Sequence, residues 1–435
     1  MDTPYQPLKA WRTALLLVVY MVINFADKIA VGLLAVPMMT ELKLSPTDFG
    51  LIGSSFFWLF AVAGVAGGFM ANRRPATGML LAMALAWSVL QIPMALSSSI
   101  LVLVVARVLL GVAEGPAWPV AVHACYKWFP NTKRELPVVC LAQGGAIGLL
   151  LAGVVMPLVT AKWGWRANFY GLAVLGLAWA LLWTAFGREG TGMETGDTAV
   201  PSNLRVPYGK LLAEPTVAAC MAMKFFSYWG LALTLTWMPV YLQRGLGFGA
   251  VEAGRLYAAS IALSMPLSLI GSWLVRQMLA RGFSSRNARG RMCAAAVALG
   301  GSAYASLWLF DLPPLVRVIL IGFTLGVSQI TYSVAPAILA EVTPGSQRGA
   351  VLAIDNSIAS VAGALAPLLT GLLVQGMAGA AGYEAGFALC GVLMIAGALA
   401  GAVAIDPERA AARVRGYALG GQEVGGRMPS SLAGR

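Results

Sequence analysis

The sequence predicts an all-α integral membrane protein in which twelve transmembrane helices form two pseudo-symmetric six-helix bundles. Hydrophobic residues make up 59% of the 435 residues and charged residues only 11%, whereas soluble domains carry about 25% charged residues. Twelve apolar runs are each long enough for the roughly 20 residues that cross a bilayer. The longest polar interruption, residues 187–215, lies between the sixth and seventh runs and divides the chain into two halves.

Each expected helix is an apolar run bounded by polar, glycine or proline residues. In the N-terminal half the runs cover residues 11–38, 49–71, 76–96, 100–123, 136–159 and 166–186. In the C-terminal half they cover residues 216–242, 251–277, 291–310, 314–339, 348–375 and 384–405. We therefore expect an N-terminal bundle over residues 1–186, a cytoplasmic linker over 187–215 and a C-terminal bundle over 216–405. The Gly-, Ala- and Arg-rich tail, residues 406–435, is expected to be disordered in the cytoplasm.

The distribution of basic residues predicts the orientation. Lysines and arginines concentrate in alternate loops, which is the pattern of cytoplasmic segments in multi-pass proteins of the cytoplasmic (inner) membrane of bacteria. Placing Lys9 and Arg12 in the cytoplasm assigns most basic loops to the same side, and an even number of spans then puts both termini there. Because the net charge of +12 is spread over these loops without interleaved aromatics, we expect no binding of nucleic acid.

Catalytic and metal chemistry have no support in the sequence. His123 is the one histidine, and none of the five cysteines forms a Cys-x-x-Cys pair. We therefore expect buried thiols without a metal or a disulfide. No catalytic triad or phosphate-binding loop is recognisable, so we expect a protein that is not an enzyme and has no cofactor.

The two halves repeat one another. The loop after the fourth run reads Pro130-Asn-Thr-Lys-Arg134, and the loop after the tenth reads Pro344-Gly-Ser-Gln-Arg348. Both are Pro-x-x-x-Arg, six helices apart. A duplicated six-helix unit is typical of secondary transporters, whose binding site lies at the midplane between the repeats.

Four ionisable residues interrupt apolar runs, where a charge costs roughly 3 kcal/mol or more. Asp27 and Lys28 lie in the first run, and Arg107 and Glu114 lie in the fourth. Arg107 and Glu114 share one helix face about 10 Å apart along the axis, whereas Asp27 and Lys28 point about 100° apart. Such a set can capture an anion and move a proton, with Lys28 toward the anion and Asp27 toward Glu114 or Arg107. Alternatively, the charges form static pairs that fix helix packing.

Several motifs resemble those of one transporter family. They are Arg107-Val-Leu-Leu-Gly-Val-Ala-Glu114-Gly-Pro-Ala-Trp-Pro119, Lys127-Trp-Phe-Pro130, Trp165-Arg166-Ala-Asn-Phe169-Tyr170, Trp237-Met-Pro239-Val-Tyr241-Leu and Arg281-Gly-Phe-Ser-Ser-Arg286-Asn-Ala-Arg289. Through these motifs the chain resembles a major facilitator superfamily transporter and, more closely, the anion:cation symporter family of sugar-acid, hexuronate and phthalate permeases. The resemblance covers nearly all of residues 11–405 and implies the major facilitator fold.

The resemblance also implies roles for individual residues. Arg107 and Glu114 match positions that bind substrate and carry protons in the family, and Asn356 matches a position that hydrogen-bonds the substrate. Lys28 is a departure, because several relatives carry arginine there, and lysine cannot fork around a carboxylate as arginine does. The Gly115-Pro116 pair that follows Glu114 is expected to open the helix locally and to expose backbone groups to a cavity.

Other polar residues within the apolar runs complete the candidate site. Asn24 and Tyr20 precede Lys28 by four and eight residues and extend its face of the helix. Asp355 is either a further proton site or the partner of Arg348. The remaining candidates for the substrate cavity are Gln143, Gln329 and Tyr332. Lys224 is expected instead to extend its ammonium to the membrane interface.

We therefore predict a functional monomer that carries a small organic carboxylate across the cytoplasmic membrane by symport with protons. Lys28 and Arg107 bind the carboxylate, and Glu114 carries the proton, with Asp27 or Asp355 as a second carboxylate. The proton is the coupling ion. The alternative is an organic-anion exchanger or uniporter in which the carboxylates are structural. Sugar acids and aromatic acids both remain open as substrates, because Trp237, Tyr332 and Phe225 leave room for ring stacking.

Overall fold

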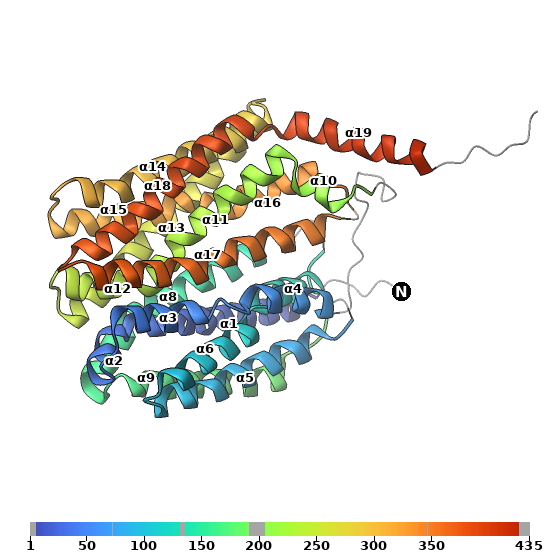
Figure 1. The fold of residues 1–435 in the computed structure, drawn as a ribbon. Coiled ribbons are helices and arrows are strands. Elements are labelled where there is room, and N and C mark those ends of the chain that lie inside the picture. The colour runs from blue at the N-terminus through green and yellow to red at the C-terminus, as the bar shows by residue number, and fades with distance from the viewer. Residues whose placement is uncertain (1–5, 72, 131–134, 191–204, 346, 426–435) are drawn as a thin grey trace, which may run out of the picture.

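The computed structural model describes residues 6–71, 73–130, 135–190, 205–345 and 347–425. Within these residues, twelve helices are long and apolar enough to cross a membrane, as the sequence predicts. Their bounds agree with the expected runs to within about two helical turns; the second span covers Pro46–Ala71 against an expected 49–71. Figure 1 shows two bundles, with the N-terminal half (blue to green) below the C-terminal half (green to red).

In the described residues, the N-terminal half contains nine helices. Eight of them form six spans, since α3 and α4 form one span and α6 and α7 form another, and the short helix α2 lies between the first two spans. The helices are α1 (Pro7–Leu33), α2 (Ala35–Glu41), α3 (Pro46–Ser55), α4 (Phe60–Ala71), α5 (Ala76–Leu96), α6 (Ile100–Glu114), α7 (Ala117–Tyr126), α8 (Glu135–Trp163) and α9 (Arg166–Phe186). The fourth span is interrupted where Gly115-Pro116 predicts: α6 ends at Glu114 and α7 begins at Ala117.

The C-terminal half repeats this plan, and its tenth span is likewise divided, at Gln329. Its elements are α10 (Tyr208–Leu212), α11 (Pro215–Thr236), α12 (Met238–Val240), the π-helix η2 (Tyr241–Gly245), α13 (Ala250–Ala280), the π-helix η3 (Arg286–Arg291), α14 (Met292–Leu309), α15 (Pro314–Ser328), α16 (Ile330–Val342), α17 (Arg348–Gly376), α18 (Ala381–Ala404) and α19 (Pro407–Gly425).

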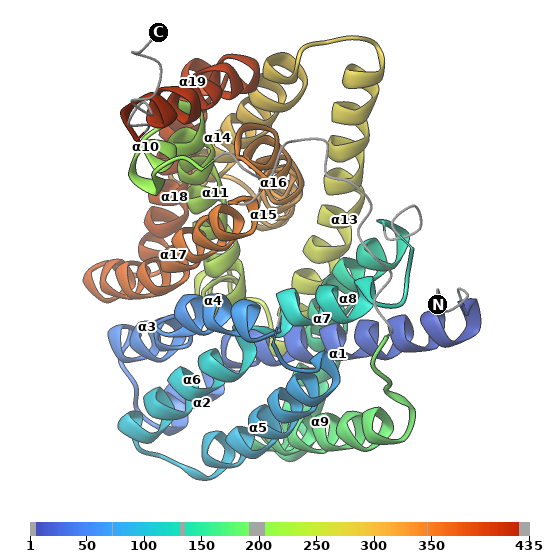
Figure 2. The ribbon, with the colours of Figure 1, turned by 90° about the vertical axis from the view of Figure 1, so that its right-hand side faces the viewer.

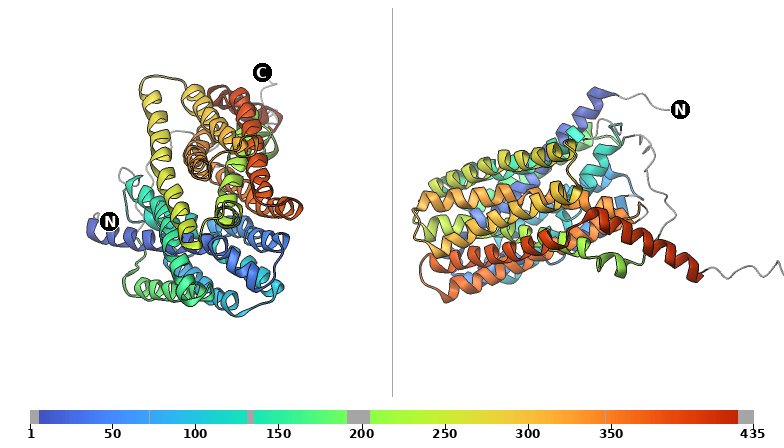
Figure 3. Two further views of the ribbon diagram at one scale, coloured as in Figure 1. Left: turned by 90° about the vertical axis from the view of Figure 1, so that its left-hand side faces the viewer. Right: turned by 90° about the horizontal axis from the view of Figure 1, so that it is seen from above.

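The halves are sealed against each other at one end of the bundle, which we call the α2–α12 end (left in Figure 1). There, Phe49 of α3 packs on Trp237 with ring centroids 5.1 Å apart, and Arg244 donates to Thr40 over 3.1 Å. Gly32 permits the closest approach, since a Cβ at this position would lie 2.1 Å from the carbonyl oxygen of Leu235. The left-hand view of Figure 3 looks at this end.

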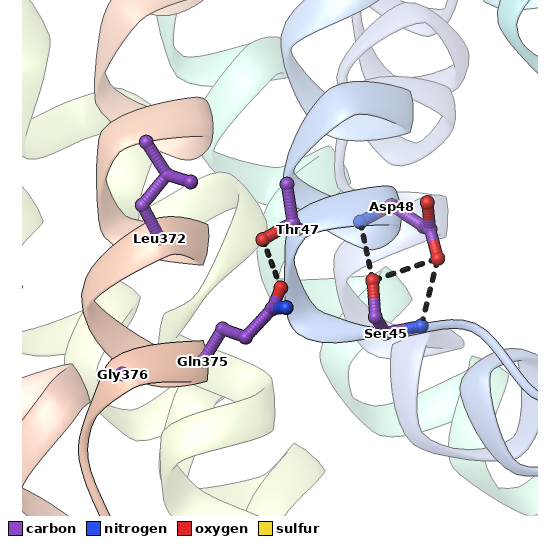
Figure 4. Close-up of a pocket in the computed structure, with 6 residues that line it drawn as sticks. All are labelled: Ser45, Thr47, Asp48, Leu372, Gln375 and Gly376. Carbon is purple, nitrogen blue, oxygen red and sulfur yellow. Dashed lines mark hydrogen bonds between the residues drawn. The ribbon is translucent and has the colours of Figure 1, made fainter.

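A surface pocket lies on this seal between α3 and α17. Its lining consists of residues from the start of α3 and the end of α17: Ser45, Thr47, Asp48, Leu372, Gln375 and Gly376. Thr47 hydrogen-bonds Gln375 across the halves, and Ser45 and Asp48 form the capping box of α3 (Figure 4). The pocket therefore belongs to the contact that closes this end.

The opposite end carries both termini and α10, and we call it the linker end; Figure 2 views it directly. In the described residues, all but one of the hydrogen bonds between the halves lie at the α2–α12 end. The exception lies farther along α17, where Ser357 Oγ donates to the carbonyl oxygen of Ala61 over 3.5 Å. Asn356 of α17 is exposed. The exposed apolar residues Val361 and Leu365 of the same helix lie about 140° and 180° around the helix axis from Asn356. Asn356 is therefore exposed on a different face of α17 from these apolar residues.

The tail expected to be disordered is helical as far as Gly425. Composition alone favours disorder, but tertiary contacts hold α19 against the bundle. Arg413 forms an ion pair with Glu214, which caps α11, and the Glu408 carboxylate accepts hydrogen bonds from the backbone of Ser285 and Arg286. Residues 426–435 lie outside the described residues.

Candidate functional site

The four ionisable residues of the N-terminal half lie close together in its interior. Asp27, Arg107 and Glu114 are 3%, 2% and 1% exposed, and Lys28 is half-buried. Glu114 interacts electrostatically with each of the other three. The two charged pairs, 80 residues apart in sequence, therefore form one cluster, which we call the N-terminal charge cluster (Asp27, Lys28, Arg107 and Glu114).

Two glycines, Gly111 of α6 and Gly115 directly after its end, bring α6 close to the second span. A Cβ at Gly111 would lie 1.9 Å from the carbonyl oxygen of Phe56, and one at Gly115 would lie 2.4 Å from that of Phe60. Because these two glycines lack side chains, the backbone of α6 packs directly on the backbone of the second span. Arg107, one turn before Gly111, is thereby placed with its guanidinium carbon 4.6 Å from the ring centroid of Phe56.

An asparagine joins the half-exposed cation to the buried carboxylate. Lys28 Nζ donates to Asn24 Oδ1 over 2.7 Å, and Asn24 Nδ2 donates to Glu114 Oε2 over 2.7 Å. Asn24 is 1% exposed, so this amide has no competing water at its sides. The Lys28–Asn24–Glu114 chain therefore connects the half-buried ammonium to the buried carboxylate.

Gln91 is a member of the site that sequence reasoning missed. Its Nε2 donates to Asp27 Oδ2 over 2.7 Å, and the side chain is 1% exposed. The available signal was that Gln91 is the one carboxamide in the run 76–96. This hydrogen bond holds the Asp27 carboxylate in place within the cluster.

The two cations of the cluster have no direct counter-ion. In the described part of the chain, no carboxylate oxygen lies within 4.0 Å of a charged nitrogen of Lys28 or Arg107. Lys28 Nζ instead lies 4.4 Å and 5.3 Å from the ring centroids of Phe25 and Phe60. Four buried polar atoms find no hydrogen-bond partner among the described residues: Asp27 Oδ1, Gln91 Oε1, Arg107 Nε and Glu114 Oε1. The cluster therefore retains capacity to bind an anion and a proton.

Tyr20, expected on the face of Lys28, lies deeper in the N-terminal half. Its ring is fully buried, with centroids 4.7 Å from those of both Trp87 and Trp179. Its hydroxyl points to Met83 Sδ at 3.9 Å. This aromatic packing buries Tyr20, which interacts electrostatically with Glu114 of the cluster.

The C-terminal half contains a buried ion pair that the sequence did not predict. Lys224 Nζ lies 2.6 Å from Asp355 Oδ2, and the two side chains are 5% and 0% exposed. The expectation that Lys224 reaches the membrane interface is therefore wrong, because its ammonium is bound inside the bundle. The alternative pairing of Asp355 with Arg348 is also wrong, since Asp355 pairs with α11 rather than with its own helix.

The other polar candidates surround the interior at different exposures. Asn356 is exposed, and Gln143, Gln329 and Tyr332 are half-buried. Gln143 Oε1 and the Tyr332 hydroxyl have no hydrogen-bond partner among the described residues. Trp237 does not line this space: it is fully buried at the α2–α12 end, where its Nε1 donates to Pro367 over 2.9 Å. Its expected role in stacking on a substrate is therefore wrong.

The described residues thus form two halves of six candidate membrane spans, and each half buries charged side chains. A model of the Major Facilitator Superfamily matches residues 16–334, more than half of the chain. The chain belongs to this superfamily, as its motifs predict.

The chain is also similar to individual transporters. It is 26% identical over 381 residues to a probable anion transporter of Oryza sativa chloroplasts, matching 84% of this chain and 64% of that protein. It is 28% identical over 376 residues to a hexuronate transporter of Bacillus subtilis, matching 81% and 85% of the two chains. The crystal structure of a D-xylose-proton symporter matches the fold with a TM-score of 0.73, covering 91% of this chain and 98% of the other at 15% identity.

Proposed function

We propose that this protein is a proton-coupled symporter of a small organic carboxylate in the cytoplasmic membrane. The observation that carries the proposal is the Lys28–Asn24–Glu114 hydrogen-bond chain, which links a cation facing the interior to a buried carboxylate. The protein acts as a monomer, with the linker end and both termini in the cytoplasm.

The substrate carboxylate binds between Lys28 and Arg107. Both cations lack a counter-ion within 4.0 Å in the described residues, so no existing ion pair has to break. Arg107 offers a planar fork suited to a carboxylate, and Lys28 offers a compact charge. Gln143, Gln329, Tyr332 and Asn356 contribute hydrogen bonds from the other sides of the interior. Tyr20 is left out of this set because it is packed between two tryptophans.

Protonation of Glu114 couples the two ligands. As an anion, Glu114 accepts from Asn24 and attracts both cations electrostatically. A proton removes this charge, so Lys28 and Arg107 are left in excess over Asp27 and bind the carboxylate more strongly. Substrate and proton together then favour rocking of one half over the other. The related hexuronate carrier supports an organic acid as the cargo.

Charge balance favours the symport over its alternative. A potential negative inside opposes entry of a monovalent anion by about 2.3 kcal/mol per 100 mV. One proton per carboxylate makes the step electroneutral and allows the pH gradient to drive accumulation. An exchanger or a uniporter gains nothing from that gradient.

The test uses the purified carrier in liposomes. A panel of carboxylates is first screened for thermal stabilisation, and the best stabiliser is then supplied in radiolabelled form. With the membrane potential clamped at zero by potassium and valinomycin, an acid-outside gradient should drive accumulation above the external concentration. Uptake that only equilibrates would establish a uniporter, and uptake that requires internal anion would establish an exchanger.

A further inference from the structure

The buried ion pair of the C-terminal half calls for an explanation beyond stability. Lys224 and Asp355 are almost fully removed from solvent, and Lys224 Nζ lies 2.6 Å from Asp355 Oδ2. The desolvation of two such charges offsets most of their attraction, and apolar residues of similar volume often stabilise a fold equally well or better. A charged pair at this position therefore contributes little more to the stability of the fold than leucine or methionine would.

The ion pair and its surroundings contain polar atoms that make no hydrogen bond within the described part of the chain. Asp355 Oδ1 and the Tyr332 hydroxyl are buried and find no hydrogen-bond partner among the described residues. Tyr332 interacts electrostatically with Asp355 and packs on Tyr228, with ring centroids 6.3 Å apart. Buried polar groups in proteins are nearly always satisfied, so these atoms indicate a site that accepts a further polar group.

The ion pair also borders the space between the halves. Asn356, the neighbour of Asp355 on α17, is exposed. Tyr228, one turn beyond Lys224 on α11, meets Phe57 of the N-terminal half with ring centroids 6.0 Å apart. A row of rings therefore connects the two halves near Lys224.

The same row of rings ends at Lys28, the half-buried cation of the N-terminal charge cluster. Phe57 packs on Phe60 at 5.9 Å, and Lys28 Nζ lies 5.3 Å from the ring centroid of Phe60. Lys28 and Lys224 thus lie in different halves, near the two ends of one row of rings in which Phe57 and Phe60 are buried. A ligand with one anionic group at each cation contacts both halves.

We propose that Lys224 is a second anion-binding residue, occupied by Asp355 in the empty carrier, and that the preferred substrate is an organic dianion. This inference rests on the proposed function. One anionic group binds at Lys28 and Arg107, and the other displaces Asp355 from Lys224. Each half then holds one end of the substrate, so only a dianion brings both halves together.

Displacement leaves Asp355 as a buried charge, which must be neutralised by a proton. The titratable groups that face it are Lys224 and Cys220 from α11 and Tyr332 from α16, none of which is a strong acid. With Glu114 also protonated, two protons accompany one dianion, and the transport cycle remains electroneutral.

The test compares acids that differ by one carboxyl group: butyrate with succinate, benzoate with phthalate, and gluconate with glucarate. Binding to the purified carrier is measured by calorimetry. The wild type should bind the diacid of at least one pair about tenfold more tightly, or about 1.4 kcal/mol. Lys224→Met combined with Asp355→Asn removes the cation without leaving an unpaired charge. This variant should lose the diacid preference and keep its affinity for the monoacid.

A matched control removes another ion pair of the same half. Arg289→Met with Glu341→Gln eliminates a partly exposed pair near the linker end and should leave the diacid preference unchanged. Asp355→Asn alone should raise the diacid affinity, because Lys224 then has no internal competitor.

The outcomes separate the two proposals. Binding of no acid by the wild type would reject the carboxylate function itself. Equal binding of monoacids and diacids by the wild type would overturn the second-site inference alone. The inference is also overturned if the double variant keeps the diacid preference, or if it cannot be purified as a folded protein, since the pair would then be structural.

Discussion

The two halves of the carrier bury their charges in different ways. In the N-terminal charge cluster, two cations and two carboxylates share one interior, yet Lys28 and Arg107 have no carboxylate oxygen within 4.0 Å in the described residues. In the C-terminal half, Lys224 and Asp355 are in direct contact at 2.6 Å. Neutrality is reached in both halves, but only the first arrangement leaves its cations free to accept a ligand without breaking an ion pair.

This difference gives the halves different sensitivities to mutation. Loss of one partner from a direct buried pair leaves an uncompensated charge and destabilises the fold. Loss of a cation from the N-terminal charge cluster breaks no ion pair, so it should affect binding more than stability. The following predictions test that distinction, beginning with the largest expected effect.

Lys224→Met should lower the free energy of unfolding by about 3–5 kcal/mol, because it leaves Asp355 charged and unpaired in the interior. Lys28→Met should cost clearly less, since its ammonium is half-exposed and bonds only to the Asn24 amide. Thermal unfolding in detergent measures both, with the exposed Lys9→Met as a control. Equal losses for Lys224→Met and Lys28→Met would remove the distinction between the halves.

Arg107→Ala should weaken binding of the substrate carboxylate by about 2–5 kcal/mol and leave a folded, membrane-inserted protein. The guanidinium has no ion-pair partner to abandon, and Phe56 beneath it remains packed. Calorimetric titration checks the affinity, and Arg255→Ala, at an exposed position of α13, is the matched control. Normal affinity in Arg107→Ala would exclude Arg107 as the anchor of the anion.

Gln91→Leu should destabilise the carrier by about 1–3 kcal/mol, because Asp27 loses the hydrogen bond that satisfies one of its oxygens. Gln243→Leu serves as control, since this half-buried glutamine donates only to a backbone carbonyl at 3.4 Å. Thermal unfolding distinguishes them. If the two variants unfold at the same temperature, Gln91 does not hold Asp27, and the arrangement of the cluster has another cause.

Lys28→Arg should change affinity by no more than about threefold, because both side chains carry a full charge and both stack on aromatic rings such as Phe25. A forked contact with the carboxylate can even strengthen binding. Transport in liposomes at matched protein content is the measurement. Complete loss of transport would mean that the site is shaped around the compact ammonium.

The sequence predicts the spans and the charge cluster but not the partners of the charges. Apolar runs and interrupting charges are local features, so twelve helices and the residues Asp27, Lys28, Arg107 and Glu114 can be identified from one chain. Lys224 and Asp355 are 131 residues apart, and their pairing depends on how α11 meets α17. An interfacial lysine and a buried one have the same local sequence signature, which explains the error at Lys224.

The role of Glu114 as the proton carrier is the central claim, and Glu114→Gln tests it most directly. Glutamine imitates the protonated acid in shape and charge, so this variant should still exchange substrate across the membrane while nothing obliges a proton to move with it. Two liposome assays are paired: counterflow, which requires only exchange, and uptake driven by a pH gradient. Glu252→Gln, at an exposed position, controls for the substitution.

Glu114→Gln should retain counterflow and lose driven accumulation, whereas Glu252→Gln should retain both. Accumulation by Glu114→Gln against a substrate gradient at the wild-type level would contradict the account, because the coupled proton would then travel on another group.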